Sequence, residues 1–319
     1  MTLLKRAFKA IPALLVLVVA GLVLHHSLAD LRWGDLALAF ASLSGWKLAG
    51  CLGAGFASLL VLGSFDVFAA GIAVPGRLSA GKALFTGVVS HAISNTLGFH
   101  ALTGGAVRYR LYRASGLGPG DIARLVSLVG LGVGLGFSTT LALVLWFDPT
   151  IALGFGRAFG LVLTLLLLAF LGWLARRPRQ VALHSWRLPL PSAPTALRQM
   201  AVGVVEMVTA ILAFYVLLPD SSFRGFVDFV PLYIGAVLLG VVSQAPGGVG
   251  VFEATMLAAL PAVERPVLVA ALLTYRAFYG LLPFVLAIAT LAVTELPTGT
   301  GSTNTIEAPP PSSKADTTA

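Results

Sequence analysis

Long, uninterrupted apolar runs constrain this chain more than any other feature of its sequence. A membrane-spanning helix needs about 17–25 predominantly apolar residues, and six runs rich in Leu, Ala, Val and Gly reach that length, at residues 11–28, 46–74, 121–147, 157–175, 198–218 and 266–294. The runs are continuous, whereas the strands of a membrane β-barrel alternate apolar and polar residues. The sequence therefore predicts an all-α, polytopic integral membrane protein with about six transmembrane helices.

The composition supports this assignment and limits the chemistry of the chain. Only 11% of the 319 residues are charged, against roughly 25% in a soluble domain, so the chain cannot cover itself with a polar surface. Cys51 is the single cysteine, which excludes an internal disulfide and a cysteine-based metal site. The formal net charge of the chain is +8, and in membrane proteins such an excess of basic residues usually lies in the cytoplasmic loops. We therefore expect no nucleic-acid partner, and we expect no cofactor.

The apolar runs are organised as one domain. We assign residues 1–294 to a single transmembrane domain and residues 295–319, which lose almost all large apolar side chains, to a disordered tail. Residues 30–43 predict a short amphipathic helix at the membrane interface, where Trp33 suits the headgroup depth. In the run 121–147, small residues spaced four apart predict close helix packing at the pairs Gly130/Gly134 and Gly132/Gly136.

Two further apolar regions, 83–112 and 227–262, are interrupted in the middle by glycine-rich breaks. If each region is a re-entrant hairpin that leaves on the side where it entered, most lysines and arginines lie in the cytoplasm, with the N-terminus and the C-terminal tail. A full crossing by the first region would instead place the basic stretch RYRLYR (108–113) outside. Because cytoplasmic loops carry the excess of basic residues, the sequence favours two re-entrant, broken-helix hairpins.

The two broken regions share a short internal repeat. GVVSHA (87–92) and GVVSQA (240–245) are each followed by a glycine break and an aromatic residue. With the topology above, the first hairpin opens from the cytoplasm and the second from the outside. The half-repeats at about 46–147 and 198–294 are then related by inversion. Inverted repeats whose broken helices meet near the membrane midplane are the architecture of secondary transporters.

The glycine breaks and the arginines beside them form the first group of candidate substrate-binding residues. Backbone can approach a ligand closely at glycine, and a half-helix that begins inside a membrane points free N–H groups at an anion. Guanidinium groups match phosphate with two parallel hydrogen bonds. The group comprises Gly104, Gly105, Gly247, Gly248, Arg108, Arg110 and Arg113. The alternative is that these arginines only anchor the fold at the inner headgroups.

Ionisable residues inside the apolar runs form the second group. Each costs about 2.5–3.5 kcal/mol at a helix centre unless it is paired, so Arg276 needs a partner, either Glu253 or Glu206. Such a pair serves either substrate binding or the stability of the fold alone. Asp66, near the inner end of its run, is expected at the interface. We expect the cavity to be lined by Ser90, His91, Asn95, His100, Ser243, Gln244 and Glu206.

Three stretches carry a resemblance to a known family. SNTLGFHALTGGAVRYRLYRASGL (94–117), SQAPGGVGVFE (243–253) and TYRAFYGLLP (274–283) resemble the membrane region of the bacterial lysylphosphatidylglycerol synthase/flippase family, over about residues 10–294. In two-part members, this region is taken to move an aminoacylated lipid between leaflets, while a soluble domain makes that lipid. Stand-alone members also exist, some associated with hopanoid or other lipid pathways. The resemblance implies a flippase-like role without synthase activity, because the soluble domain is absent here.

These observations support one main functional hypothesis and leave others open. The main hypothesis is a lipid translocase or lipid-binding carrier for an anionic or aminoacylated lipid in the bacterial inner membrane. The alternatives are a membrane-embedded accessory protein or transferase of lipid or hopanoid headgroup modification, and a small-solute transporter. No catalytic constellation is visible, and His91 and His100 lack metal-ligand spacing, so we expect neither an enzyme nor a metal site. The expected partners are a membrane phospholipid or modified lipid, and a lipid-modifying enzyme.

Overall fold

The computed structural model describes residues 22, 25, 32–147, 155–176, 180–183, 186–220, 222–223 and 225–295. The predicted first span (11–28), except residues 22 and 25, and the predicted tail (295–319), except residue 295, lie outside the described residues. The predicted interfacial segment contains a short helix, α2 (Trp33–Ala41). The assignment of the whole chain to one domain stays a prediction.

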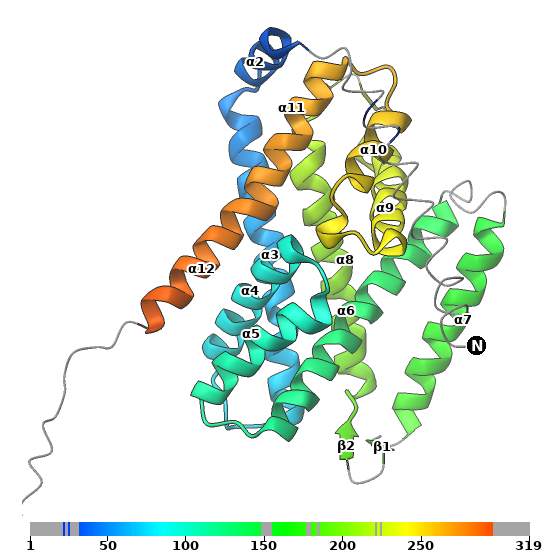
Figure 1. The fold of residues 1–319 in the computed structure, drawn as a ribbon. Helices are drawn as coiled ribbons and strands as arrows, with labels where there is room; N and C mark the ends of the chain where they lie inside the picture. Colours follow the sequence, from blue (N-terminus) through cyan, green and yellow to red (C-terminus); the bar gives the residue numbers. More distant parts are fainter. Residues whose placement is uncertain are drawn as a thin grey trace, which may run out of the picture.

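The described elements form a bundle of long helices (Figure 1). In chain order α2 is followed by α3 (Gly45–Ala73), α4 (Ala80–Leu97), α5 (His100–Ala114), α6 (Pro119–Phe147), α7 (Gly156–Arg176), β1 (Gln180–Leu183), β2 (Trp186–Pro189), α8 (Ala193–Tyr215), α9 (Phe226–Ser243), the 3₁₀ turn η2 (Pro246–Gly248), α10 (Val251–Ala259), α11 (Arg265–Tyr275), the π-helix η3 (Arg276–Leu281) and α12 (Leu282–Glu295). The strands form one antiparallel pair, which the sequence analysis did not predict.

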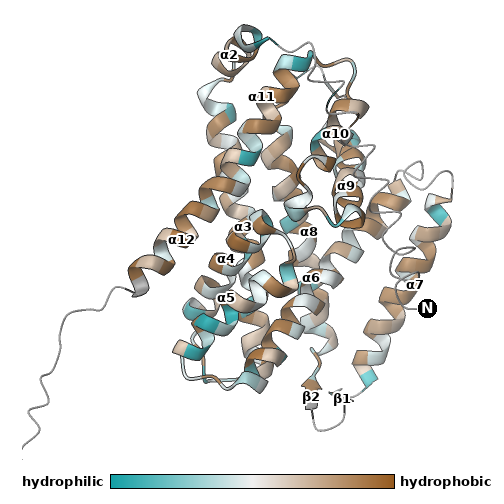
Figure 2. Cartoon of the chain, in the orientation of Figure 1, coloured by the Kyte–Doolittle hydropathy of each residue, from teal (hydrophilic) through white to brown (hydrophobic). Residues whose placement is uncertain are grey.

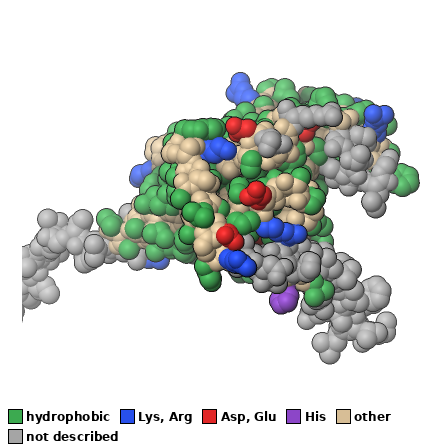
Figure 3. Space-filling view, turned by 90° about the horizontal axis from the view of Figure 1, so that it is seen from above, with side chains coloured by type: hydrophobic (Ala, Val, Ile, Leu, Met, Phe, Trp, Pro, Cys, Tyr) green, Lys and Arg blue, Asp and Glu red, His purple; other side chains and the backbone are tan. Residues whose placement is uncertain are grey.

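Six of the described helices are long and apolar enough to cross a membrane. Five of them occupy predicted spans, at 46–74, 121–147, 157–175, 198–218 and 266–294. The sixth is α9, which the sequence assigned to one arm of a re-entrant hairpin. Hydrophobic residues dominate the long helices (Figure 2), and charged side chains are scattered over the end of the bundle where α11 begins, above mostly hydrophobic sides (Figure 3). The predicted all-α, polytopic fold is confirmed.

Both broken regions are helical hairpins. In the first, α4 and α5 are joined by Gly98 and Phe99, whose φ angles of 75° and 48° reverse the chain. In the second, α9 ends at Gln244 (φ 55°), and η2 leads to Gly250 (φ 83°) before α10. The two hairpins enter the bundle from opposite ends, as the inverted-repeat prediction requires (Figure 1).

The two hairpin tips meet in the middle of the bundle. A Cβ atom placed on Gly98 would lie 2.7 Å from the backbone nitrogen of Gly247, and one placed on Gly247 would lie 2.8 Å from the carbonyl oxygen of Thr96. Backbone therefore packs directly on backbone, which only glycine permits at this distance.

Helices α3, α6 and α8 pack closely behind the tips. A Cβ placed on Gly136 of α6 would lie 2.6 Å from the Cα of Gly203 on α8, and Gly132 lies against Phe65 and Gln199. The predicted packing role of Gly132 and Gly136 is confirmed. The same prediction for Gly130 and Gly134 is wrong, because no described atom lies within 4 Å of a Cβ placed on either.

Candidate functional site

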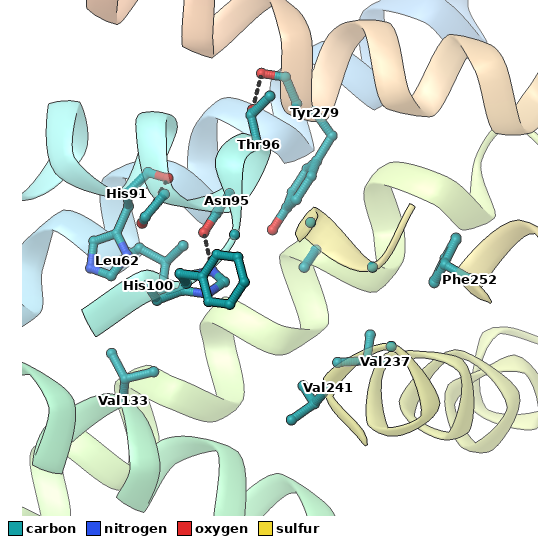
Figure 4. A pocket seen from close by; sticks show the side chains of 18 of the residues that line it. Leu62, His91, Asn95, Thr96, His100, Val133, Val237, Val241, Phe252 and Tyr279 are labelled. Carbon is teal, nitrogen blue, oxygen red and sulfur yellow. Dashed lines mark hydrogen bonds between the residues drawn. The ribbon is translucent and has the colours of Figure 1, made fainter. Parts of the chain in front are cut away.

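A cavity of about 800 Å³ lies where the two hairpin tips meet. Its wall is mostly apolar, with side chains from α3, α6, α8 and α9, and Figure 4 shows Val133, Val237 and Val241 facing it. Many of the predicted residues line it, namely His91, Asn95, His100, Arg108, Glu206, Gln244, Gly247, Gly248 and Arg276. Ligand pockets commonly combine such an apolar wall with a few placed polar groups.

Arg276 holds the second hairpin tip. It forms an ion pair with Glu253, and its Nη1 donates a hydrogen bond to the carbonyl oxygen of Gly247 at 2.9 Å. The other carboxylate oxygen of Glu253 accepts from the backbone nitrogen of Gly250 at 2.7 Å. The sequence left the partner of Arg276 open between Glu253 and Glu206, and the structure selects Glu253. Neither side chain is fully buried, since 30% of Arg276 and 16% of Glu253 are exposed.

Arg108 occupies a different environment from the one predicted. Its Nε and Nη2 atoms donate two hydrogen bonds of 2.8 Å to the two carboxylate oxygens of Asp66, and the Tyr112 hydroxyl donates to the same carboxylate at 2.7 Å. The side chains of Arg108 and Asp66 are 4% and 0% exposed. The prediction that Arg108 belongs to an exposed cluster with Arg110 and Arg113 is therefore wrong, and Asp66 is buried as its counter-charge, since a buried charge in an apolar bundle must be paired.

The remaining residues of the first candidate group are spread along α5. Arg110 and Arg113 are exposed, and the Nη1 of Arg113 donates to the carbonyl oxygen of Leu117 at 3.2 Å. Neither arginine lines the cavity. Gly104 and Gly105 lie within α5 and do not line the cavity, so the structure does not bring these two predicted binding residues to the site.

Glu206 lies deep in α8 and lines the cavity with 9% of its surface exposed. Its Oε1 accepts a hydrogen bond of 3.0 Å from the hydroxyl of Ser58, which is also 3.0 Å from the hydroxyl of Tyr279. Two further tyrosines of the wall, Tyr233 and Tyr275, share a hydrogen bond of 2.7 Å. The sequence analysis missed this tyrosine cluster, although TYRAFYG carries two of its members four residues apart on one helix face.

The other polar residues predicted to line the cavity divide into two groups. His100 Nε2 lies 3.2 Å from Asn95 Oδ1 at the first tip, and Gln244 donates to the carbonyl of Val241 at 2.7 Å beside the second. Ser90 and Ser243 do not line the cavity. Ser243 instead accepts a hydrogen bond from the backbone nitrogen of Ala245 at 3.1 Å and so supports the tip.

Metal binding receives no support from this geometry. In the described ranges, no group of three His, Cys, Asp or Glu side chains is placed to hold a metal ion. His91 lines the cavity, and its Nε2 is buried without a hydrogen-bond partner among the described residues.

Comparison with known proteins places the chain among bacterial membrane proteins. It is 28% identical to the uncharacterized protein slr0712 of Synechocystis over 86% of both chains, and 26% identical to the inner membrane protein YbhN of Escherichia coli over 86% of this chain and 87% of that one. It is also 25% identical to the phosphatidylglycerol lysyltransferase of Staphylococcus aureus over 84% of this chain. The resemblance to the lysylphosphatidylglycerol synthase/flippase family is confirmed, because the chain is similar over most of its length to part of this lysyltransferase. The match spans only 32% of that lysyltransferase, and no protein-family model matches this chain.

These relatives and the long helices establish the general class of the chain. It is a multi-pass membrane protein. One named relative acts on a phospholipid, since its name describes the lysylation of phosphatidylglycerol. What this chain itself does at the cavity has to be argued from the geometry of the tips.

Proposed function

We propose that the chain is a lipid translocase or lipid-binding carrier that moves an anionic or aminoacylated lipid between the leaflets of the bacterial inner membrane. The observation that carries the proposal is the cavity at the meeting point of two hairpins that enter from opposite ends of the bundle. Such a cavity is reached from either leaflet when one tip or the other retreats, which is the geometry of alternating access.

The contact between the tips is held by few bonds, which suits a gate. The π-helix η3 clasps both tips, because Thr96 of the first donates to the carbonyl of Gly280 at 3.2 Å and Arg276 donates to Gly247 of the second. π-Helical turns inside α-helices are frequent at functional sites. Breaking these few bonds would release both tips from η3, while the Arg108–Asp66 pair still joins the first hairpin to α3.

Arg108 and Arg276 have different roles in this proposal. Arg108 is tightly neutralised by Asp66, so we assign it to the stability of the first hairpin. Arg276 is more exposed, so its guanidinium can exchange Glu253 for the phosphate of a lipid headgroup. Arg110 and Arg113, at the end of α5, attract anionic headgroups to the cytoplasmic surface.

A second candidate function follows from the match to part of a phosphatidylglycerol lysyltransferase. The chain would then serve as the accessory membrane component of a separate lipid-modifying enzyme, receiving that enzyme's product. In both cases we propose that the chain is not itself an enzyme, and that its N-terminus and C-terminal tail are cytoplasmic.

The proposal is tested with purified protein in vesicles that carry chain-labelled phosphatidylglycerol or lysylated phosphatidylglycerol in the inner leaflet. A membrane-impermeant quencher added outside reports the label that reaches the outer leaflet. We expect the wild-type protein to expose at least one of these lipids faster than protein-free vesicles do. Arg276→Ala should slow this exposure about tenfold to a hundredfold, since a hydrogen bond to a charged group contributes about 1.5–3 kcal/mol.

Arg157→Ala is the matched control, because Arg157 is exposed, does not line the cavity and has no role in the proposal. We expect it to keep most of the wild-type rate once the lipid is incorporated. If the wild-type protein moves neither lipid faster than protein-free vesicles, the translocase proposal is wrong.

A further inference from the structure

Glu206 differs from the other carboxylates inside the bundle. Asp66 is bound to Arg108, and Glu253 is bound to Arg276. Glu206 is as deeply placed, yet no lysine, arginine or histidine in the described ranges forms an ion pair with it. Among the described residues, Ser58 alone donates a hydrogen bond to the carboxylate of Glu206. The side chain of Glu206 lines the cavity. A carboxylate in such a place needs a cation, and the smallest cation available to any water-accessible cavity is a proton.

The surroundings of Glu206 favour a proton over a metal or a fixed basic group. Helix α8 packs against α3, α6, α7, α9 and α11. The described charged and titratable groups on these helices, on α8 itself and on η3 are Lys47, Cys51, Asp66, Asp121, Arg124, Arg157, Arg176, Arg198, Tyr215, Asp228, Tyr233, Arg265, Tyr275, Arg276 and Tyr279. Most lie at helix ends, and the two inside the bundle that bear charge, Asp66 and Arg276, already have partners.

A hydrogen-bonded chain connects Glu206 to the gate. With Glu206 ionised, Ser58 donates to its Oε1, and the hydroxyl of Tyr279 is left to donate to Ser58. A proton on Glu206 reverses this order, since the carboxyl group then donates to Ser58 and Ser58 donates to Tyr279. Tyr279 belongs to η3, whose neighbouring Gly280 carries the bond to Thr96 at the first tip (Figure 4). Protonation therefore acts on the element that clasps both tips.

We propose that Glu206 is a proton-binding site that couples movement of the tips, and with it lipid movement, to a proton gradient. The proposal rests on the proposed lipid-translocase function. A carboxylate oxygen of Glu206 takes a proton from hydronium that enters the cavity from one side, which leaves water. It returns that proton to water on the other side after the tips exchange, so that the cycle consumes nothing except the gradient.

The experiment uses vesicles with labelled phosphatidylglycerol or lysylated phosphatidylglycerol, in separate preparations, with a pH-sensitive dye inside. The membrane potential is clamped with potassium and valinomycin. With one proton per lipid, a gradient of about one pH unit should produce about tenfold asymmetry of the labelled lipid between the leaflets. Reversal of the gradient should invert the asymmetry, and the dye should report a proton flux that requires the lipid.

Three variants separate coupling from folding and from lipid binding. Glu206→Gln keeps the shape of the side chain and its contact with Ser58, and we expect it to lose the asymmetry and the lipid-dependent proton flux. Glu206→Asp should restore part of both. Glu264→Gln changes an exposed carboxylate at the start of α11 and should behave as the wild type. Infrared difference spectra should show a protonated-carboxyl band that grows as the pH falls and is missing in Glu206→Gln.

The contrary outcomes are distinct from one another. A wild-type protein that moves lipid to the same distribution with and without the gradient overturns the coupling and leaves the translocase proposal standing. Loss of transfer in Glu206→Gln for the lysylated lipid alone, with gradient-independent transfer in the wild type, would make Glu206 a site for the ammonium headgroup. A wild-type protein that moves neither lipid overturns both proposals.

Discussion

In the described part of the bundle, two arginines that line the cavity are each paired with one carboxylate. Arg108 has Asp66, and Arg276 has Glu253. The first pair is almost fully buried and has a third member, Tyr112, whereas the second is more exposed and has a backbone carbonyl as its third member. Both arginines line the cavity, so the difference between the pairs lies in their burial and in their third partner.

Loss of the buried Arg108–Asp66 pair should destabilise the protein strongly. Asp66→Ala leaves the Arg108 guanidinium buried without a counter-charge, a change that costs about 3–5 kcal/mol. Lys82→Ala, which changes an exposed lysine at the start of α4, should change the free energy of unfolding by less than about 0.5 kcal/mol. Unfolding of the detergent-solubilised protein, followed by tryptophan fluorescence, measures both. Similar stabilities for the two variants would contradict the structural role of the pair.

The sequence allows one of these pairs to be predicted and hides the other. Arg276 and Glu253 are isolated charges in apolar surroundings, so each signals that it needs a partner. Arg108 stands in RYRLYR, where charge density suggests a water-facing cluster, and its partner is 42 residues away. The helical phase held the missing signal, since Arg108 and Tyr112 are four residues apart and share a face. Glu206 could be identified as a lining residue, but its hydrogen-bond partners depend on tertiary packing.

Among the elements, the hairpin tips depend on glycine more than any helix does. Position 98 requires glycine for two reasons, its positive φ of 75° and its close approach to Gly247. Gly76 has the same φ, yet no described atom lies within 4 Å of a Cβ placed on it. Gly76 therefore serves as a reference position with positive φ and no close contact.

Gly98→Ala should cost more than Gly76→Ala for this reason. Both variants place an alanine at positive φ, but Gly98 also has ψ −167°, a region essentially restricted to glycine, and only Gly98→Ala pushes the tips apart. We expect Gly98→Ala to unfold at the lower temperature and to expose both tips to proteolysis. Equal unfolding temperatures and equal proteolysis would show that the tips do not meet as the structure has them.

A second pair of glycines tests the packing of α6 on α8. Gly136→Ala meets the backbone of Gly203, whereas Gly134→Ala meets no described atom within 4 Å. We expect Gly136→Ala to destabilise the protein by about 1–3 kcal/mol through overpacking, and Gly134→Ala to be neutral or slightly stabilising. Thermal unfolding of the two single variants and of the double variant Gly136→Ala/Gly134→Ala should show that the loss of stability depends on residue 136 alone.

Hydropathy predicts the positions of the long helices, whereas glycines in the sequence are a less reliable guide to where a helix is interrupted. The pair Gly104–Gly105 looks like a break in the sequence but continues a helix, because glycine at 104 makes room for the guanidinium of Arg108, whose Nη1 would lie 2.9 Å from a Cβ there. The break at Gly98 and Phe99 is predicted from its glycine and aromatic residue, and the structure confirms it. The positive φ of Phe99 is not visible in the local sequence, because residues other than glycine rarely adopt it.

Across the whole molecule, the two hairpins point toward each other from opposite ends. We therefore expect residue 114, at the end of the first hairpin, and residue 262, after the second, to lie on opposite sides of the membrane. Cys51 is fully buried, so its replacement by alanine gives a background in which each site is probed alone.

In that background, Ala114→Cys and Ala262→Cys should react with an impermeant thiol reagent from opposite sides. Both positions are exposed, so failure to react is informative. We expect residue 114 to be labelled only in inverted membrane vesicles, because the positive-inside rule places the arginines of α5 in the cytoplasm, and residue 262 only in intact cells. Labelling of both from one side would refute the inverted arrangement.

The backbone contact between the tips has an evolutionary consequence. A side chain at residue 98 is tolerated only if the second tip withdraws, so changes at 95–98 and at 246–248 are not independent. Alignments of relatives should show these two segments changing together, in lineages whose substrates differ in headgroup size. The cavity would then be remodelled by paired substitutions drawn from both halves of the gene.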